Sequence, residues 1–503
     1  MVISPGQESN GRPSPRELTT SPLRGGPSES FHEPARGRSP AAAPQEDAAT
    51  GDRSRADSSQ FMAGEQVRKD EAAFQPTIEE HLSAEAIVAL QEAAWRQTWD
   101  HVWAHSPFYR QHLRRAGLSP DEPVPLSQLH RIPPIDKAVV SENSQAFLCV
   151  PRDQVVDIVA TSGTTGPSLL WMLTERDLQR LALNEWLSFR CAGLTARDTV
   201  LLAVTLDRGF IAGLAYFLGL RMLGCGIIRV GPSTPALHLD LMRRLRPTAI
   251  VGVPSFLCLL ADKAAEAGLD PVTLGVRQAV CIGEAIRHPD LTLNRAGMTL
   301  EQRWQTRVFS TYGVTELAAS LCECEHGCGG HLHPELLHLE ALDPAGQPVP
   351  EGEVGELTAT TFGVEAMPLV RYRTGDCAAI HRQPCCCGRR TVRIGPIVGR
   401  LGHKLKLKGT TLFPSTLKTV LDATAGVAAY VILARRTADG ADAVEVRIAC
   451  ATDPAPLTRT LRERFQGAAR VVPDITVASA AEVEALQMPE GSRKRRYFVD
   501  LRE

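Results

Sequence analysis

Hydroxyl side chains and glycines crowd one short loop in the first third of the chain. The stretch TSGTTGPS covers residues 161–168 and directly follows VVDIVA, an apolar and β-branched run that is typical of a strand. Backbone N–H groups in a glycine-rich turn form a concave nest for anions, and Ser and Thr hydroxyls add donors without blocking close approach. The loop is not a Walker A motif, because no Lys follows its last glycine. It indicates either a polyphosphate cradle or an ordinary polar turn.

Three further stretches carry residue types that suit a nucleotide. STYGVTE follows an apolar run, so Tyr312 can stack on a base while Glu316 holds a Mg²⁺ that bridges phosphates. RYRTGD ends in Asp376, whose carboxylate can accept hydrogen bonds from both ribose hydroxyls. VGRLGHKLKLKG (398–409) supplies an Arg followed by alternating lysines. Each stretch alone also fits a structural role, as a buried Tyr, a turn Asp or a solvated strand face, so their order along the chain is the informative feature.

Six of the thirteen cysteines crowd into two short segments, CECEHGCGGHLH and PCCCG. Thiolates and imidazoles are the ligands of closed tetrahedral Zn²⁺ sites. Cys324, either Cys328 or His331, Cys385 and Cys387 would complete such a site. Because no position would stay open, the set indicates a structural metal that braces the two segments. The spacing fits no stock zinc-finger pattern, and the alternative is a set of free thiols that pack as small buried hydrophobes.

Strand-like and helical runs alternate through the middle of the chain and must position these residues. TVLLAVTL, CGIIRVG, TAIVGVP, QAVCIGE and RVFSTYG are separated by helical patterns such as HLDLMRRLR, which predicts a largely parallel α/β sheet. After Gly399 a strand, a helix, a hairpin, a helix and a last strand predict a small α+β domain. The beginning of the chain is rich in Pro, Ser, Gly and Arg, which predicts a disordered tail. The expected domains are therefore 1–75, 76–398 and 399–503.

The composition of the 503 residues favours an enzyme that handles small molecules. The chain is 43% hydrophobic and 22% charged, which is enough for two or three domains with sizeable cores. With a net charge of −2, the chain has no excess of positive charge with which to bind nucleic acid or a membrane surface. No apolar run reaches the roughly 18 residues that a bilayer span needs, and MVISPGQESNGRPSP lacks the apolar core of a signal peptide. We therefore expect a cytoplasmic protein with no nucleic-acid or membrane partner.

Five motifs occur in an order that resembles the adenylate-forming, acyl-CoA synthetase-like superfamily: TSGTTG, GEA, YGVTE, YRTGD, and GR followed by KLKG. HSPFYRQHLRRAGL, GEAIR, AMPLVRYRTGD, CCCGRRTVRIGPIVGR and GTTLFP narrow the resemblance to the phenylacetate-CoA ligase branch, which includes coenzyme F390 synthetase-like proteins. The likeness covers nearly everything except the tail. It implies an α/β fold in which a large adenylate-forming domain with mixed and parallel sheets precedes a small mobile α+β domain.

Members of this superfamily activate a carboxylic acid with ATP and Mg²⁺, release pyrophosphate, and pass the acyl group from an acyl-adenylate to a thiol, usually that of CoA. The resemblance implies that Glu316 binds Mg²⁺ and that Thr315 contacts the α-phosphate. It also places the ribose on Asp376, with Arg400 nearby. The other nucleotide contacts that it implies, to the phosphates and the adenine, are Thr161, Ser162, Gly163, Thr164, Thr165, Gly166, Gly283, Glu284, Ala285, Tyr312 and Gly313.

The superfamily also uses a lysine near the carboxyl terminus, which bridges the carboxylate and the α-phosphate during adenylation. Counting back from the last strand in PEGSRKRRYFVDLR gives this role to Lys494. The alternative is a merely solvated basic tail. The small domain that supplies this lysine must swing away before a thiol can attack, and the resemblance implies a pivot at residues 401–403.

This sequence departs from its relatives at two places. Gly402 and His403 replace the usual hinge carboxylates, although a glycine still permits a large rotation. Pro167 and Ser168 stand where many relatives have Lys-Pro, which removes a point charge from the phosphate loop. Both changes bear on the rate and on the choice of thiol acceptor.

The segment RGFIAGLAYFLGL would line the acyl pocket of such an enzyme. Phe210, Ala215, Tyr216 and Phe217 indicate an apolar pocket for an aryl or medium-length acyl acid. The leading hypothesis is therefore an AMP-forming ligase that joins an aryl or acyl acid to CoA. Transfer to a carrier-protein thiol or to an amine is the alternative within enzymes, and a non-catalytic nucleotide-binding protein is the alternative outside them. The resemblance also raises a homodimer as an expectation.

Overall fold

The computed structural model describes residues 81–161, 169–207, 209–231, 233–408, 410–437, 441–489 and 495–502. The predicted tail, most of the phosphate loop and Lys494 lie outside the described residues. By contacts, Gln75–Glu503 form one compact unit. The domain limits at 75/76 and 398/399 therefore stay predictions.

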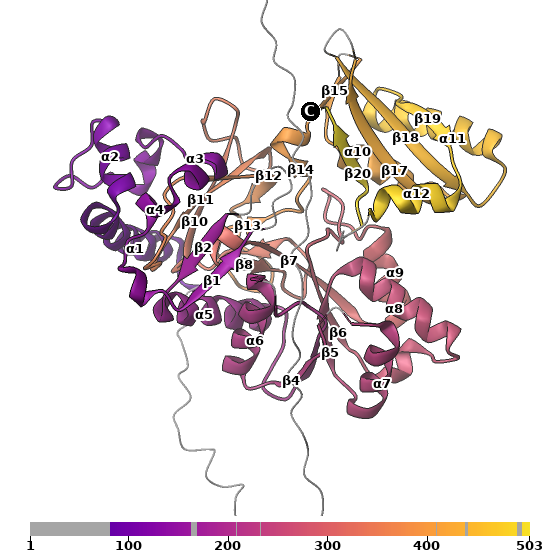
Figure 1. The fold of residues 1–503 in the computed structure, drawn as a ribbon, viewed down its shortest axis with the longest axis horizontal. Helices are drawn as coiled ribbons and strands as arrows, with labels where there is room; N and C mark the ends of the chain where they lie inside the picture. Colours follow the sequence, from indigo (N-terminus) through magenta and orange to yellow (C-terminus); the bar gives the residue numbers. More distant parts are fainter. Residues whose placement is uncertain are drawn as a thin grey trace, which may run out of the picture. The chain divides into compact units, whose positions relative to one another are not determined.

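A six-stranded sheet carries the α/β part of the chain, in the strand order β4-β3-β5-β6-β7-β8 (Figure 1). Its strands pair in parallel up to β7, and β8 pairs antiparallel with β7. The predicted, largely parallel α/β sheet is thereby confirmed. The strands are β3 (Thr199–Leu202), β4 (Gly226–Arg229), β5 (Ala249–Gly252), β6 (Gln278–Ile282), β7 (Arg307–Val314) and β8 (Ala319–Cys322).

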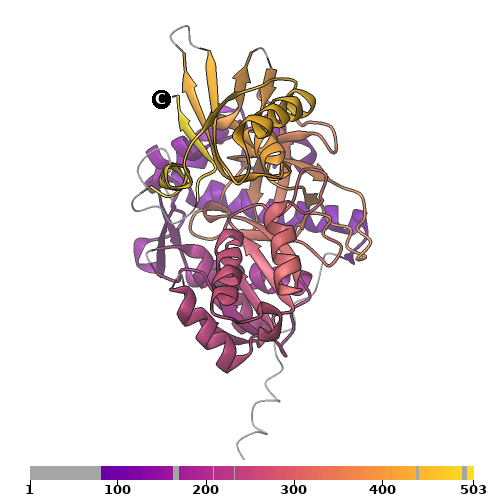
Figure 2. The ribbon, with the colours of Figure 1, turned by 90° about the vertical axis from the view of Figure 1, so that its right-hand side faces the viewer.

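Helices cover both faces of this sheet, because alternate residues of each strand point to opposite sides. Leu201 and Ile250 pack against α7, α8 and α9, whereas their neighbours Val200 and Val251 pack against α5 and α6. Helices α8 and α9 lie in front of the sheet in Figure 2. Burial on both sides explains the continuous apolar runs of the strands. The helices are α5 (Glu175–Cys191), α6 (Ile211–Leu223), α7 (Pro235–Leu245), α8 (Pro254–Glu266) and α9 (Arg295–Trp304).

A second six-stranded sheet, antiparallel throughout, carries the RYRTGD motif. The amino-terminal helices pack against it, with Trp95 and Trp99 in one core with Leu339 and Leu357. Its strands are β9 (Gly330–His331), β10 (Leu337–Leu342), β11 (Val354–Thr361), β12 (Tyr372–His381), β13 (Arg393–Ile394) and β14 (Gly399–Arg400). The helices before it are α1 (Ala84–His105), α2 (Pro107–Arg115), α3 (Lys137–Glu142) and α4 (Ser144–Phe147).

The last hundred residues have a hydrophobic core of their own, formed by residues from Leu405 to Val471. The four-stranded sheet has the order β19-β18-β17-β20, with β17 and β18 as the predicted hairpin. Strand, helix, hairpin, helix and last strand follow one another as predicted, with β16, β19 and α12 in addition. The elements are β15 (Leu405–Leu407), β16 (Thr410–Leu412), α10 (Pro414–Asp422), β17 (Val427–Arg436), β18 (Asp442–Cys450), α11 (Pro454–Ala469), β19 (Asp474–Val477), α12 (Ala480–Gln487) and β20 (Phe498–Leu501).

A short hairpin holds the two ends of the predicted phosphate loop. Strands β1 (Asp157–Ala160) and β2 (Leu170–Leu173) pair antiparallel. The Thr161 N–H continues the ladder by donating to the Leu169 carbonyl over 2.9 Å. The strand predicted before the loop is thus present, and the two residues that flank the loop, Thr161 and Leu169, lie side by side.

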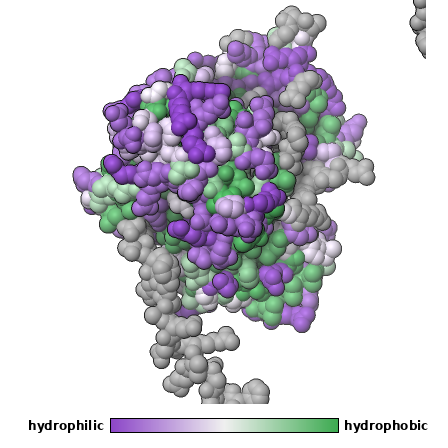
Figure 3. Space-filling view, turned by 60° about the vertical axis from the view of Figure 1, so that its left-hand side comes forward, coloured by the Kyte–Doolittle hydropathy of each residue, from purple (hydrophilic) through white to green (hydrophobic). Residues whose placement is uncertain are grey.

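Hydrophilic and hydrophobic residues share the molecular surface. The face drawn in Figure 3 is a mosaic of the two kinds, with hydrophobic residues gathered toward its lower right. Within the described part of the chain, every helix is too short or too polar to traverse a lipid bilayer.

Candidate active site

A pocket of about 440 Å³ opens where the motifs of the two six-stranded sheets meet. Strands β6 and β7 contribute their carboxyl ends, which is the edge where open α/β sheets bind ligands. The pocket brings together seven of the residues that the sequence predicted to bind the nucleotide: Gly283, Glu284, Ala285, Tyr312, Gly313, Asp376 and Arg400. Residues that the sequence did not predict to bind the nucleotide also line it: Ser310, Thr311, Leu321, Glu323, Gly330, Ile394, Gly395, Pro396, Ile397, Gly399 and His403.

Asp376 is fixed on the pocket wall by two donors from different elements. The Tyr312 hydroxyl donates to one carboxylate oxygen over 3.0 Å, and Nε of Arg400 donates to the other over 3.2 Å. The pairing of β12 with β14 sets the second contact, because Asp376 and Arg400 are direct partners in the register. Burial raises the pKa of Asp376, while Arg400 and Tyr312 oppose that shift. The carboxylate is therefore held in one orientation and keeps acceptor capacity for hydroxyl groups.

The GEA segment turns sharply at the end of β6 and presents its backbone to the pocket. Gly283 has a φ of 72°, which favours glycine at this position. The carboxylate of Glu284 accepts hydrogen bonds from the backbone N–H and the hydroxyl of Ser255, at 3.0 and 2.8 Å. Because Ser255 lies in the first turn of α8, this contact anchors the segment to a helix N-terminus.

Glu316 lies in a polar cluster beside the loop hairpin. This buried carboxylate is 3.4 Å from Nζ of Lys137 and accepts a hydrogen bond of 3.3 Å from the Tyr372 hydroxyl. The same Nζ donates to Oγ1 of Thr161 over 2.9 Å. Thr315 and Glu316 form the short turn η5 (Thr315–Leu317) directly after β7. The amino-terminal end of the phosphate loop and the predicted Mg²⁺ ligand are thus joined through one ammonium group.

Lys137 was not among the residues predicted from the sequence to form the site. The residue lies in IDKAVV at the start of α3, far from every motif, and its side chain is 43% exposed. The side chain of Asp136 caps this helix by accepting from the backbone N–H of Val139, which sets the helix start. The only available signal was a lysine directly after a helix cap, and that pattern alone assigns no function.

The cysteine-rich segments meet and gather four ligand atoms. Cys324, His331, Cys385 and Cys387 each offer one atom, and all four atoms lie within 4.8 Å of one another. The sulfurs of Cys324 and Cys385 are 3.7 Å apart, as are Cys387 Sγ and His331 Nε2. Two sulfurs about 2.3 Å from a tetrahedral metal would be roughly 3.7 Å apart, whereas a disulfide needs about 2.05 Å. The geometry therefore suits a metal with three thiolates and one imidazole.

Cys328, the alternative to His331 in the sequence prediction, lies just outside this group. It belongs to a second cluster with Cys385 and the exposed Cys386. This group of four candidate ligands also adjoins the pocket described above, because Glu323 and Gly330 line that pocket and each directly precedes one of the four residues.

Residues 162–166 and Lys494 lie outside the described residues. Tyr497 lies three residues after Lys494 in the sequence. Burial raises the pKa of Tyr497 to about 12, and the Glu284 carboxylate is the next largest cause. Tyr497 therefore lies near the Glu284 carboxylate of the pocket wall.

The residues predicted to line the acyl pocket lie at the start of and along α6. Ala215 and Tyr216 are buried, and the Tyr216 ring packs edge-on against Phe189 of α5. Phe217 is partly buried and lies under the guanidinium of Arg229, 5.3 Å from it. The side chains of α6 thus divide between the helix interface with α5 and the edge strand β4.

A buried polar cluster next to Tyr216 was not expected from the sequence. The carboxyl of Glu185 accepts hydrogen bonds from the Ser320 hydroxyl and the Asn184 amide, at 3.0 and 3.1 Å. Burial raises the pKa of Glu185 to about 7, against the opposing effects of Ser320, Asn184 and His333. Its signal in the sequence is weak, because one Glu in an amphipathic helix normally faces water.

Known proteins with sequences similar to this chain are AMP-binding enzymes and phenylacetate-coenzyme A ligases. Residues 132–365 match the family model described as AMP-binding enzyme. The chain is 31% identical over 385 residues to the phenylacetate-coenzyme A ligase of Thermus thermophilus, covering 75% of this chain and 84% of that protein. It is 30% identical over 345 residues to the phenylacetate-coenzyme A ligase of Pseudomonas putida, covering 67% and 76% of the two chains.

Solved structures share the fold at lower identity. A 2-hydroxyisobutyryl-CoA ligase in the postadenylation state superimposes with a TM-score of 0.73 at 19% identity, covering 85% of this chain and 94% of that chain. The same ligase in the thioesterification state gives a TM-score of 0.62 at 22% identity, covering 84% and 92%. The fold expected from the ordered motifs is thereby confirmed.

Proposed function

This chain belongs to the phenylacetate-coenzyme A ligase family of AMP-binding enzymes, and we propose that it joins a carboxylic acid to coenzyme A at the expense of ATP. In the first step the carboxylate oxygen attacks the α-phosphorus of ATP, and pyrophosphate leaves with the α–β bond electrons. In the second step the CoA sulfur attacks the acyl carbonyl, loses its proton, and AMP leaves. Acid, ATP and CoA are thus consumed, and acyl-CoA, AMP and pyrophosphate are formed.

The observation that carries this proposal is the convergence of three distant motifs on one pocket. Tyr312, Asp376 and Arg400 come from β7, β12 and β14 and form one hydrogen-bonded group. A rigid carboxylate beside an aromatic ring suits a ribose with an attached base. Positioning of this kind is the main contribution that a protein makes when two anions must react.

The cluster around Glu316 is our candidate for the phosphate end of the site. A Mg²⁺ ion held by Glu316 would neutralise phosphate charge and orient the leaving pyrophosphate. The ammonium of Lys137 lies between Glu316 and Thr161 and would contribute a second positive charge. That charge offsets the one that Pro167 and Ser168 remove from the loop. Thr315, residues 162–166 and Lys494 keep their proposed roles at the α-phosphate, the outer phosphates and the attacking carboxylate.

We also propose that Cys324, His331, Cys385 and Cys387 hold a structural Zn²⁺. The donor set is the soft, closed kind that zinc prefers, and the 3.7 Å separations fit a tetrahedral site. The Nδ1 of His331 is 3.5 Å from the Thr391 hydroxyl, a partner that would orient the ring. When bound, the metal would tie the loop after Glu316 to the loop after Asp376.

All thirteen cysteines are outside disulfides, which supports a reducing compartment and hence a cytoplasmic location. The acid that best suits the apolar residues of α6 is an aryl or medium-length acyl acid. A carrier-protein thiol or an amine is the alternative acceptor. A homodimer is a further proposal, which light scattering of the purified protein would test.

A pyrophosphate-release assay with a panel of carboxylic acids tests the proposal. We expect release that requires one class of apolar acid, and acyl-CoA that accumulates only when CoA is present. Pyrophosphate without any thioester would exclude CoA as the acceptor and favour the carrier protein or the amine. ATP binding without turnover of any acid in the panel would contradict ligase activity and favour a non-catalytic nucleotide-binding protein.

A further inference from the structure

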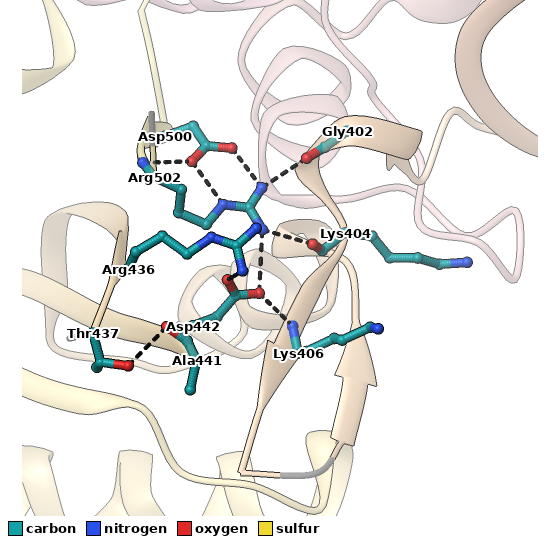
Figure 4. Close-up of polar contacts among 9 residues, drawn as sticks. All are labelled: Gly402, Lys404, Lys406, Arg436, Thr437, Ala441, Asp442, Asp500 and Arg502. Atoms are coloured by element: carbon teal, nitrogen blue, oxygen red, sulfur yellow. Dashed lines mark hydrogen bonds and ion pairs between the residues drawn. The ribbon is translucent and has the colours of Figure 1, made fainter. Parts of the chain in front are cut away.

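The last described residue, Arg502, inserts its side chain beside the predicted pivot of the small domain. The guanidinium follows β20 and is only 9% exposed. It donates to the carbonyl of Gly402 over 2.7 Å and to the carbonyl of Lys404 over 2.8 Å (Figure 4). Residues Leu401–His403 form the short turn η6 between β14 and β15. The carboxyl-terminal strand therefore reaches back, over about one hundred residues of sequence, to hold the chain where the two domains join.

Two carboxylates hold the same guanidinium in place. Asp500 accepts from Nε over 2.8 Å and from Nη2 over 2.5 Å, and Asp442 accepts from Nη1 over 3.2 Å. With the two carbonyls, these contacts give each of the five guanidinium N–H groups an acceptor. Asp442 also accepts from the backbone N–H of Lys406 over 2.7 Å. Lysine could not reproduce this arrangement, because its ammonium has three donors and no planar fork.

The carboxylates and the carbonyls belong to different segments, so the Arg502 guanidinium links the sheet of the small domain to the backbone of the turn. Asp500 and Asp442 are residues of β20 and β18, which lie in the sheet of the small domain. The ring of His403 also packs against Phe498 of β20, with centroids 5.1 Å apart. The backbone from the Gly402 carbonyl onward is therefore fastened to the small domain, although it precedes the first strand of that domain.

The segment before the turn is fastened to the opposite side. Gly399 and Arg400 pair with β12, and Arg400 also binds Asp376 of the nucleotide pocket. Only Leu401 and Gly402 separate the two attached segments. A Cβ at Gly402 would meet no atom within 4 Å, and a glycine backbone can adopt φ and ψ values that other residues disfavour.

We propose that Arg502 is a positioning residue that clamps the backbone after Gly402 to the small domain and thereby concentrates domain rotation at Leu401 and Gly402. The inference rests on the proposed two-step function, in which the small domain must serve each step in a different arrangement. A pivot of two residues defines both arrangements sharply. A pivot that spreads over several residues would place the small domain less accurately in each, and small misplacements cost large factors in rate.

The variant Arg502→Lys tests the clamp, because it keeps a positive charge for Asp442 and Asp500 but loses the donors to the carbonyls. Hydrogen exchange measured by mass spectrometry should rise at least fivefold across residues 401–406. The turnover numbers for pyrophosphate release and for thioester formation should both fall about tenfold, while the affinity for AMP alone stays within twofold. Binding of AMP depends on the pocket and not on the rotation.

Arg447→Lys is the matched control. Arg447 lies on β18 of the same sheet and forms an ion pair with Glu445 at 2.7 Å, without touching the turn. It should leave exchange and both rates unchanged. Asp500→Asn is the second variant in case Arg502→Lys unfolds, because it keeps the guanidinium and weakens only its anchor, and it should raise exchange in the same segment.

Three outcomes would overturn the proposal. They are unchanged exchange across 401–406 in a folded variant, raised exchange with wild-type turnover, and a loss of turnover that disappears at a temperature where the variant is fully folded. The exchange measurement needs no substrate. A failure of the ligase assignment would therefore leave the wild type inactive with every acid, whereas a failure of the clamp would appear as unaltered exchange.

Discussion

Lys137 shows best how individual residues acquire a role through the fold. It lies at the start of α3, yet its ammonium group contacts both Thr161 and Glu316. A lysine in IDKAVV has no periodic or motif signal, so no reading of the local sequence could identify it. By contrast, Asp376, Tyr312 and the GEA segment were predicted because their order along the chain matches a known family.

We expect Lys137→Ala to lower kcat/KM for ATP by roughly tenfold, about 1.4 kcal/mol of transition-state stabilisation, because it removes a cation from the phosphate end of the site. Steady-state kinetics with saturating acid would measure the change. Lys263→Ala is the control, because Lys263 is similarly exposed, 45% against 43%, and pairs only with Glu266 on its own helix. Equal kcat/KM in the two variants would remove Lys137 from the site.

Glu185 predicts a pH dependence of stability. Its pKa is raised by burial from 4.5 to about 7, so the folded protein retains a proton that the unfolded chain releases. Stability should therefore fall as pH rises from about 4.5 to about 7, by roughly 3 kcal/mol if no other group compensates. Tyr216 and His333 are the titratable neighbours of this carboxyl. In Glu185→Gln that component of the pH dependence should be lost.

Thermal unfolding at pH 5 and pH 8 would measure this effect. From pH 5 to pH 8 the melting temperature of the wild type should fall by more than that of Glu185→Gln. Glu175→Gln, on the exposed face of the same helix, should lose as much melting temperature as the wild type. A parallel shift of the wild type and Glu185→Gln would show that Glu185 titrates normally.

At the level of elements, the parallel sheet and the small domain were predictable, whereas the second sheet was not. Apolar runs between helical patterns identify β3 to β7 by local sequence alone. The short strands β9, β13 and β14 have only two residues each. These strands are defined by pairing with residues far away in the sequence, as Arg393 of β13 pairs with His331 of β9. The hydrophobic periodicity of a sequence does not identify such partners.

The two cysteine-rich segments also act at the level of elements. One of them connects β8 to β9, and the other connects β12 to β13. Cys385→Ser should reduce bound zinc from about one per chain to near zero, as measured by atomic emission. It should also raise the KM for ATP severalfold, because Gly330 and Ile394 pair with each other and line the nucleotide pocket. Disordering this wall should loosen the pocket without removing any nucleotide contact proposed above.

Cys386→Ser is the control for this element. Cys386 is the adjacent thiol and is exposed, outside the group of four ligands. It should keep both the zinc and the KM of the wild type. A wild-type protein that carries no zinc, or equal metal content in the two variants, would contradict a metal at this place.

At the scale of the whole molecule, we propose that two parts, each with a hydrophobic core of its own, are joined by a pivot of two residues. The large part contributes the nucleotide pocket, and the small part contributes the clamp at Arg502 and, as proposed, Lys494. The sequence predicted both parts and the position of the turn between them. It could not predict the clamp, because a terminal Arg in DLRE looks like any solvated basic residue. The contact exists only because β20 pairs in parallel with β17 and so ends beside the turn.

A crystal structure of the full chain with ATP and Mg²⁺ tests the central claim most directly. We predict that the ribose hydroxyls lie within hydrogen-bond distance of Asp376 and that the adenine lies against Tyr312 and the GEA segment. The phosphates should extend toward Thr161, Glu316 and Lys137. A nucleotide bound elsewhere, or a pocket that stays closed to ATP at saturating concentration, would contradict the account.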